Sequence, residues 1–199
     1  MKTGNFIISF FCAMAMIAFT SCLQDKKGPF VKKEILFSPD TTINKLIIDD
    51  ITANSSKIKQ IEWIKDIRMQ PVALFFNRDK SEYLLAYQSY KINIEGFRFF
   101  EVGYTAKQSQ LLQKEGVVLQ TAHFKTESGI QLGVSSSLVH KKKGKPHETA
   151  FTKGNQLQID TYRLSPSHPY VAKHHATDYR MELTYRSDTV ILFKFGFDE

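Results

Sequence analysis

Three histidines and one aspartate lie close together near the C-terminal end of the chain, in the stretch HPYVAKHHATD. They are His168, His174, His175 and Asp178. Imidazole nitrogens and carboxylate oxygens are ligands that zinc and copper accept in proteins, so this loop is a candidate metal site. The spacing follows no established ligand motif, and loop histidines that bind no ligand explain it as well. We therefore predict that the protein has no cofactor, with these residues as weak candidates for a metal or small-molecule site.

Consecutive serines after a glycine, in the stretch GVSSS, are the candidate for nucleophilic chemistry. The nucleophile elbow of hydrolases needs a second glycine two residues after the serine, and Ser137 stands there when Ser135 is taken as the nucleophile. Asp49 and Asp50 are neighbouring acids, but adjacent side chains diverge on a helix and point to opposite faces of a strand. We predict that the protein is not an enzyme.

The serine stretch also has the residue types that begin and end a short helix. Gly133 permits a tight turn before it. Ser135 can accept a hydrogen bond from a free backbone N–H one turn further on. Val139 belongs to an apolar face, Gly144 suits the position after the last turn, and Pro146 prevents the helix from continuing. The sequence thus predicts a structural role for each of these residues.

The same five residues have the spacing of a motif in the small outer-membrane lipoproteins of the BamE/SmpA type. That motif has Gly-Met-Ser/Thr, three variable positions, Val, four positions, Gly, one position and Pro. This chain departs from it at Val134, where the family has Met, and at Lys143, where the family has Leu and a core contact is lost. The resemblance implies a helix and a three-stranded antiparallel sheet over residues 126–199, and scaffolding or partner binding at the outer membrane.

The N-terminus has the layout of a secretory signal peptide. Lys2 supplies a positive charge, and Phe6–Phe19 is an apolar run of about fourteen residues, where a bilayer span needs about twenty. Small residues and then Cys22 follow. This arrangement resembles the lipobox of bacterial lipoproteins, in which the cysteine is acylated and becomes the first residue of the mature chain. Phe19 stands where that pattern most often has Leu, and an ordinary signal peptide with a chance cysteine is the alternative.

The cysteine content fits a lipid anchor at Cys22. The only other cysteine is Cys12, which lies inside the apolar run and would be removed with it. The mature chain then keeps one thiol and forms no internal disulfide, in a compartment that permits disulfides. Leu23 follows Cys22, not the aspartate that resembles an inner-membrane retention signal. By that resemblance the destination is the outer membrane, with the periplasmic or surface face left open.

The chain is basic, with 27 Lys and Arg against 20 Asp and Glu and a formal net charge of +7. Nucleic acid is not an expected partner in the cell envelope. The charge could favour an anionic surface such as lipid phosphates, or it could be a solvated surface without a dedicated ligand. We expect a membrane contact through the N-terminal lipid, and a protein or envelope component as partner.

Most of the remaining chain has the patterns of β-strands. Apolar and alternating runs predict strands at Pro71–Phe76, Ser81–Gln88, Gly96–Tyr104, Glu115–Phe124, Gln156–Leu164, Asp178–Tyr185 and Thr189–Phe197. Isoleucines at every third position within Ser55–Arg68 favour an amphipathic helix, with an irregular strand pair as the alternative. Sixteen Phe and eight Tyr fit a β-rich core.

The predicted fold class is α+β, a mainly antiparallel sheet with one or two short helices, ending in a C-terminal helix plus a three-stranded sheet. The predicted order is a lipoprotein signal peptide (1–21), a polar leader (22–28), a β-rich part (29–125) and the BamE-like module (126–199). Asp40-Thr41-Thr42 and Asp188-Thr189-Val190 also resemble the O-glycosylation acceptor of Bacteroidota, which makes Thr41 and Thr189 candidate modification sites. The composition suits that phylum.

Overall fold

The computed structural model describes residues 36–48, 63–65, 71–88, 96–152, 154 and 156–198. The predicted signal peptide, Cys22 and the leader lie outside these residues, as does most of 55–68. Within that last range, Trp63–Lys65 form a strand, as in the alternative to the helix. Residues from Glu34 to Glu199 form one compact unit. No helix in the described part of the chain is long and apolar enough to cross a bilayer.

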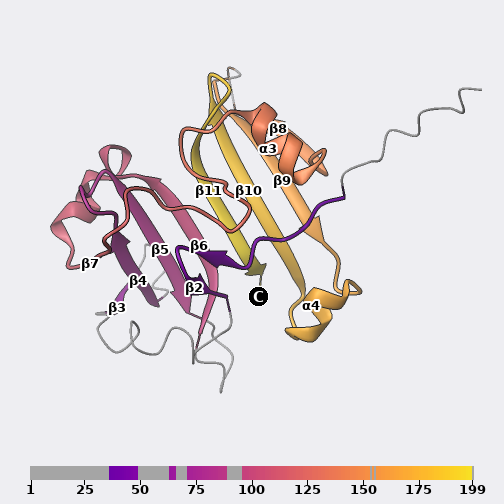
Figure 1. The fold of residues 1–199 in the computed structure, drawn as a ribbon, viewed down its shortest axis with the longest axis horizontal. Coiled ribbons are helices and arrows are strands. Elements are labelled where there is room, and N and C mark those ends of the chain that lie inside the picture. The colour runs from indigo at the N-terminus through magenta and orange to yellow at the C-terminus, as the bar shows by residue number, and fades with distance from the viewer. Residues whose placement is uncertain are drawn as a thin grey trace, which may run out of the picture. The chain divides into compact units, whose positions relative to one another are not determined.

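One nine-stranded sheet dominates the described chain (Figure 1). Its order is β3-β4-β5-β6-β11-β10-β9-β8, and β7 makes an additional pair with β4. The strands are β3 (Trp63–Lys65), β4 (Pro71–Phe76), β5 (Glu82–Gln88), β6 (Phe97–Tyr104), β7 (Val117–Val118), β8 (Glu148–Phe151), β9 (Gln158–Leu164), β10 (Asp178–Arg186) and β11 (Thr189–Asp198). The β7–β4 pair is parallel and the other strand pairs are antiparallel. The strands β1 (Thr42–Ile43) and β2 (Leu46–Ile47) pair with each other in a second, small sheet.

The helices of the described chain are short. They are α3 (Ser136–Lys143), α4 (Pro169–Lys173) and two 3-10 helices, η1 (Thr105–Lys107) and η2 (Ser109–Gln113). The ends of α3 are those that the sequence predicts. The Ser135 hydroxyl accepts from the backbone N–H of Leu138, and Gly144 has a φ of 78° and donates its N–H to the carbonyl of His140. Gly133 turns the chain before the helix with a φ of 83°.

The predicted α+β fold class is wrong, because the protein is mostly β and its C-terminal strands do not form a separate three-stranded sheet. The three predicted strands exist as β9, β10 and β11, but β8 adds a fourth and β11 pairs with β6. Every residue of β8 is exposed, so this strand carries no apolar pattern that predicts it. The predicted strand Glu115–Phe124 is also wrong in extent, since only Val117–Val118 are in a strand.

The main core lies on one face of the sheet. It includes Phe100 of β6, Met181 of β10 and Phe195 of β11, together with Val139 of α3 and Ile43 of β1. In Figure 1 the indigo segment with β2 and the segment before α3 both run across this face of the sheet. A second core lies on the opposite face of β4 and β5. It consists of Val72, Leu74, Phe76, Tyr83 and Leu85, with Leu111 of η2 packed against them.

Candidate functional site

The first described residues of the chain are held on the folded body by a buried ion pair. We call residues 36–48 the N-terminal segment. Lys143 Nζ lies 2.9 Å from Asp40 Oδ2, and the two side chains are 2% and 1% exposed. The same ammonium donates to the carbonyl oxygen of Ser38 at 2.8 Å and lies 5.7 Å from the centre of the Phe37 ring. One lysine therefore contacts three residues of the segment.

Besides Lys143, Asp40 has hydrogen-bond partners for both its carboxylate and its backbone. Ser128 donates its hydroxyl to Asp40 Oδ2 at 2.9 Å and its backbone N–H to Oδ1 at 3.2 Å. Tyr179 donates its hydroxyl to the Asp40 carbonyl at 2.7 Å, and that hydroxyl accepts from the Asp40 N–H at 3.0 Å. Burial, then the nearby Asp40 carboxylate, raise the pKa of Tyr179 well above its ordinary value. The Tyr179 phenol therefore stays protonated. The Asp40 carboxylate, the Asp40 backbone N–H and carbonyl, and the Tyr179 hydroxyl all have partners within the protein.

Glu127 fixes the next two residues of the segment. Its Oε1 accepts from the backbone N–H of Thr41 at 2.7 Å and its Oε2 from that of Thr42 at 2.6 Å. The two threonine hydroxyls also donate to it, at 2.9 and 2.8 Å. Burial alone would raise the pKa of Glu127, but these four hydrogen bonds outweigh it and the net pKa is lowered. We call Asp40, Ser128, Lys143 and Glu127 with their bonds the clamp.

The helix α3 positions the lysine of the clamp. Val139 and Lys143 are one turn apart and are the buried residues of this helix. The sequence-based interpretation of Lys143 as a lost core contact is therefore wrong, because its side chain occupies the buried position and is neutralised by Asp40. Leu138 is 38% exposed and does not belong to the core. His140, at the outer edge of the helix, places Nε2 2.7 Å from Oδ2 of the fully buried Asp160 and so fixes α3 to β9.

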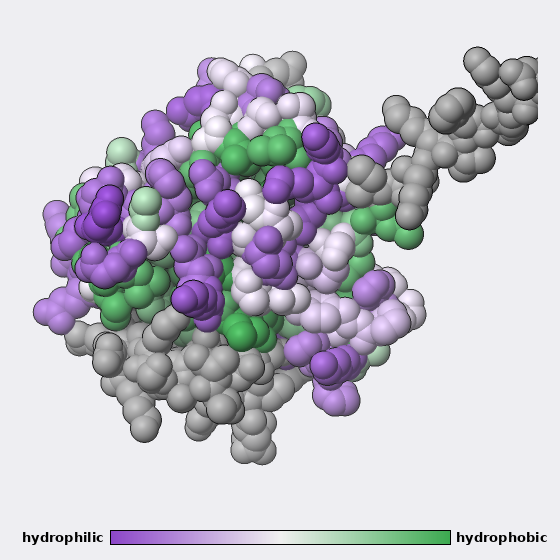
Figure 2. All heavy atoms as spheres, in the orientation of Figure 1, coloured by the Kyte–Doolittle hydropathy of each residue, from purple (hydrophilic) through white to green (hydrophobic). Residues whose placement is uncertain are grey.

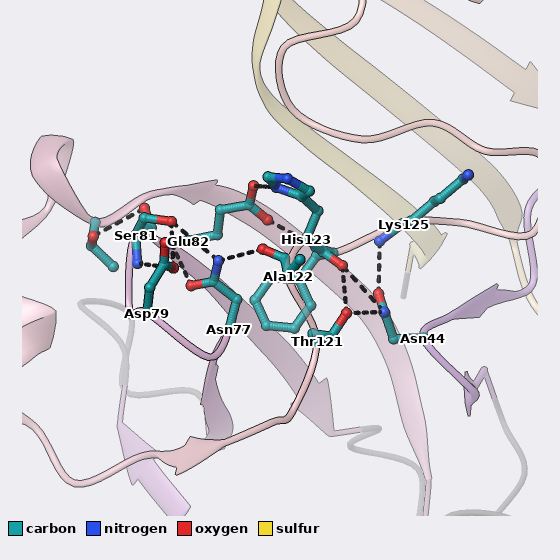
Figure 3. Close-up of polar contacts among 11 residues, drawn as sticks. Asn44, Asn77, Asp79, Ser81, Glu82, Thr121, Ala122, His123 and Lys125 are labelled. Carbon is teal, nitrogen blue, oxygen red and sulfur yellow. Dashed lines mark hydrogen bonds and ion pairs between the residues drawn. The ribbon is translucent and has the colours of Figure 1, made fainter.

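A second polar network joins the β4–β5 turn to residues 121–125 (Figure 3). Glu82 is 2% exposed, and its Oε1 lies 2.7 Å from His123 Nδ1 while its Oε2 accepts from the N–H of Phe124 at 2.8 Å. Asn77 accepts from the N–H of Glu82 at 2.9 Å and donates to the carbonyl of Ala122 at 2.7 Å. The carboxylate orients an imidazole that is 56% exposed, an arrangement suited to general-base chemistry. Together these contacts join the β4–β5 turn to the chain at Ala122, His123 and Phe124.

Of the three consecutive serines, Ser135 has the predicted role of helix cap, and Ser136 and Ser137 lie in the first turn of α3. Ser135 caps α3 and its hydroxyl lies 2.8 Å from that of Ser137, while Ser136 donates to Asp188 at the β10–β11 turn. None of these contacts forms a nucleophile–base pair with His140.

The three loop histidines do not converge. His168 caps α4 by accepting from the N–H of Tyr170 at 3.2 Å. The ring centre of His174 lies 4.9 Å from that of Tyr170 and 4.9 Å from that of Phe197, and these two rings stack on each other at 5.4 Å, so the three rings form a triangle. His175 follows with a φ of 51°. Within the residues that the structure describes, no group of three or more His, Cys, Asp or Glu side chains is placed to hold a metal ion.

Of the candidate glycosylation sites, Thr41 is engaged by the clamp. Its hydroxyl donates to Glu127, so a glycan at this position would break that contact. Thr189 begins β11 and is half-buried.

No family model matches this chain, and neither a curated protein nor a solved structure does. The resemblance of Gly133–Pro146 to the BamE/SmpA motif therefore stays a prediction from the sequence.

The sequence predicted the helix α3, which carries Lys143, but it did not predict the contacts of the clamp. Its partners Asp40, Ser128 and Lys143 come from three distant segments, and no local pattern joins them. A signal did exist at Lys143, since a charged residue one turn after Val139 on a predicted apolar face needs a buried partner.

Proposed function

We propose that this protein is a lipid-anchored component of the bacterial cell envelope, acylated at Cys22 and located at the outer membrane. Its work is non-enzymatic: it binds a protein or another envelope component in a structural or assembly role. The acylated Cys22, which follows the lipobox-like residues, is the anchor, and residues 23–35 connect it to the body.

The observation that carries the proposal is the clamp. A body held by one N-terminal lipid needs its tether joined firmly to the fold, because any pull on the anchor acts on the first folded residues. Asp40, Thr41 and Thr42 are the residues that Lys143 and Glu127 hold. Behind them Ile43 and Leu46 are fully buried in the main core. The tether therefore ends in a segment that cannot leave without opening the core.

Crosslinking in the native host tests this proposal. Tagged wild type and Cys22→Ala are expressed at equal levels, intact cells are crosslinked, and co-purifying proteins are identified after membrane fractionation. We expect wild type in the outer-membrane fraction with a discrete set of partners, and loss of both with Cys22→Ala. Identical soluble fractionation of the two forms, with nothing specific attached, would contradict it.

A further inference from the structure

Exposed lysines surround the place where the N-terminal segment reaches the folded body. Lys141 and Lys142 lie in the last turn of α3, Lys145 follows the helix, and Lys125 lies on the neighbouring segment. The loop at Gly129 brings two of them together, since a Cβ on that glycine would lie 2.9 Å from Lys142 Nζ and 3.2 Å from Lys125 Cε. We call Lys125, Lys141, Lys142 and Lys145 the basic surface.

The last turn of α3, which carries two of these lysines, also holds the N-terminal segment in place. Lys143, between Lys142 and Lys145 in the chain, is the residue that binds Ser38 and Asp40. In Figure 1 the indigo segment accordingly begins beside α3 and β9. The chain that leads back to Cys22 therefore leaves the body next to the basic surface.

The acids near this surface are mostly engaged in other contacts. Asp40 is buried against Lys143, and Glu127 accepts four hydrogen bonds from Thr41 and Thr42. Glu148 of β8 is the exposed acid that follows Lys145 in the chain. A helix dipole explains cations in the last turn of α3, but it does not explain Lys125 and Lys145, which lie outside the helix.

Exposed apolar side chains accompany these charges. Leu36 is 82% exposed at the start of the described segment, and Leu138 on α3 is 38% exposed. Figure 2 shows hydrophilic and hydrophobic patches mixed on the visible face in this region. Lysines together with exposed leucines are typical of surfaces that rest on the headgroup layer of a membrane.

We propose that the basic surface docks on an anionic, phosphate-bearing membrane. This inference rests on the proposed anchor at Cys22. Because Leu36 is fourteen residues from Cys22, the point where an anchored body begins can lie at most about 50 Å from the lipid, and the basic surface lies next to that point. The anchor keeps the lysines at high effective concentration beside lipid phosphates, and the lysines fix which side of the body faces them.

Vesicle binding tests the docking without the lipid anchor. Residues 23–199 are suitable, because the compact unit from Glu34 to Glu199 contains the whole described core. Binding is measured by flotation with phosphatidylcholine vesicles, with and without phosphatidylglycerol. The variant is Lys125→Gln/Lys141→Gln/Lys145→Gln, which leaves the Lys142 contact with the Ser128 carbonyl intact. The matched control, Lys107→Gln/Lys114→Gln/Lys173→Gln, removes the same charge at η1, η2 and α4.

We expect wild type to bind the anionic vesicles only, and to lose binding in high salt. Each lysine at such a surface contributes about fivefold, so the variant should bind at least tenfold more weakly while the control changes less than threefold. Equal losses in the two triple variants, or equal binding of wild type to neutral vesicles, would overturn the proposal. Displacement by millimolar inorganic phosphate would also overturn it, because that result indicates a discrete phosphate site.

Thermal unfolding of both triple variants checks that they fold. If the Lys125→Gln/Lys141→Gln/Lys145→Gln variant does not fold, the single variants Lys141→Gln and Lys145→Gln are tested in its place. A failure of this assay leaves acylation of Cys22 in cells unaffected, so it is distinguishable from a failure of the proposed anchor.

Discussion

The two halves of the large sheet differ in how many faces they bury. In β4, the neighbouring residues Leu74 and Phe75 are 1% and 0% exposed, although their side chains point to opposite faces. In β10, Leu183 is fully buried while Thr184 beside it is half-buried. The half around β4 and β5 therefore lies between two layers, and the half around β10 is covered on the side of the main core.

The uncovered face of the second half is held by contacts between charged side chains. Lys194 of β11 lies 2.9 Å from Glu101 of β6, and Arg180 lies 3.6 Å from Glu182 within β10. The Arg180–Glu182 pair is partly exposed and contributes little, and Glu101 of the other pair is buried at the junction with β6, so the rest of this half depends on the other face, where α3 and the N-terminal segment pack. This difference between the two halves explains why the clamp lies beside the β10 half. The half with one buried face is the half that needs a covering segment fixed in place.

The largest expected effect is at the strand pair that joins the halves. Gly196 of β11 has a φ of 146°, and a Cβ there would lie 2.2 Å from the backbone oxygen of Arg98 in β6. Gly196→Ala should therefore push the two strands apart and lower the free energy of unfolding by more than about 4 kcal/mol. Gly154→Ala is the control, since it has a φ of 84° with open space around it and should cost about 1 kcal/mol. If chemical denaturation gave similar losses of stability for Gly196→Ala and Gly154→Ala, the close approach of β11 to β6 would not be what makes Gly196 necessary.

Next in size is the loss of the clamp lysine. Lys143→Met leaves the Asp40 carboxylate buried without its cation, and should destabilise the protein by about 3–5 kcal/mol. The double variant Asp40→Asn/Lys143→Met removes both charges and should recover part of that loss. If both variants unfold at the same denaturant concentration as wild type, the ion pair does not hold the segment.

Truncation of neighbouring strand residues sharpens the contrast between the halves. Leu74→Ala and Phe75→Ala should each cost about 3 kcal/mol, because both leave cavities. In β10, Leu183→Ala should cost about as much, whereas Thr184→Ala should cost less than about 1 kcal/mol. Urea denaturation of the four variants measures this, and a large loss with Thr184→Ala would mean that a second layer covers β10.

The smallest effect concerns Glu127, which is partly exposed. Its pKa in the folded protein is lowered from the ordinary value of 4.5, so its stabilisation is complete above that value and is lost as the pH falls through the folded pKa. Glu127→Gln should cost about 1 kcal/mol at pH 7, after allowance for solvent screening. The difference from wild type should vanish in more acidic solution. A difference that stays constant from pH 7 to pH 3 would exclude the carboxylate as its source.

Local signals predicted much of the secondary structure. Ser135 and Gly144 end α3 as their residue types require, and the alternating runs became β9 and β10. The features that the sequence did not predict depend on contacts between distant segments. The pairing of β11 with β6 and the partner of Lys143 are set by tertiary packing, which no single stretch encodes. The β8 strand has no buried face, so its place in the sheet comes only from backbone pairing with β9.

The most direct test of the proposed anchor is the intact mass of the native protein extracted from membranes of its host. An anchored protein should begin at Cys22 and carry the additional mass of acyl chains on that residue, released with the N-terminal peptide on proteolysis. The Cys22→Ala variant should lack that mass. A native chain that begins elsewhere, or that begins at Cys22 with no added mass, would contradict the lipid anchor, and with it the role of the clamp in holding a membrane tether.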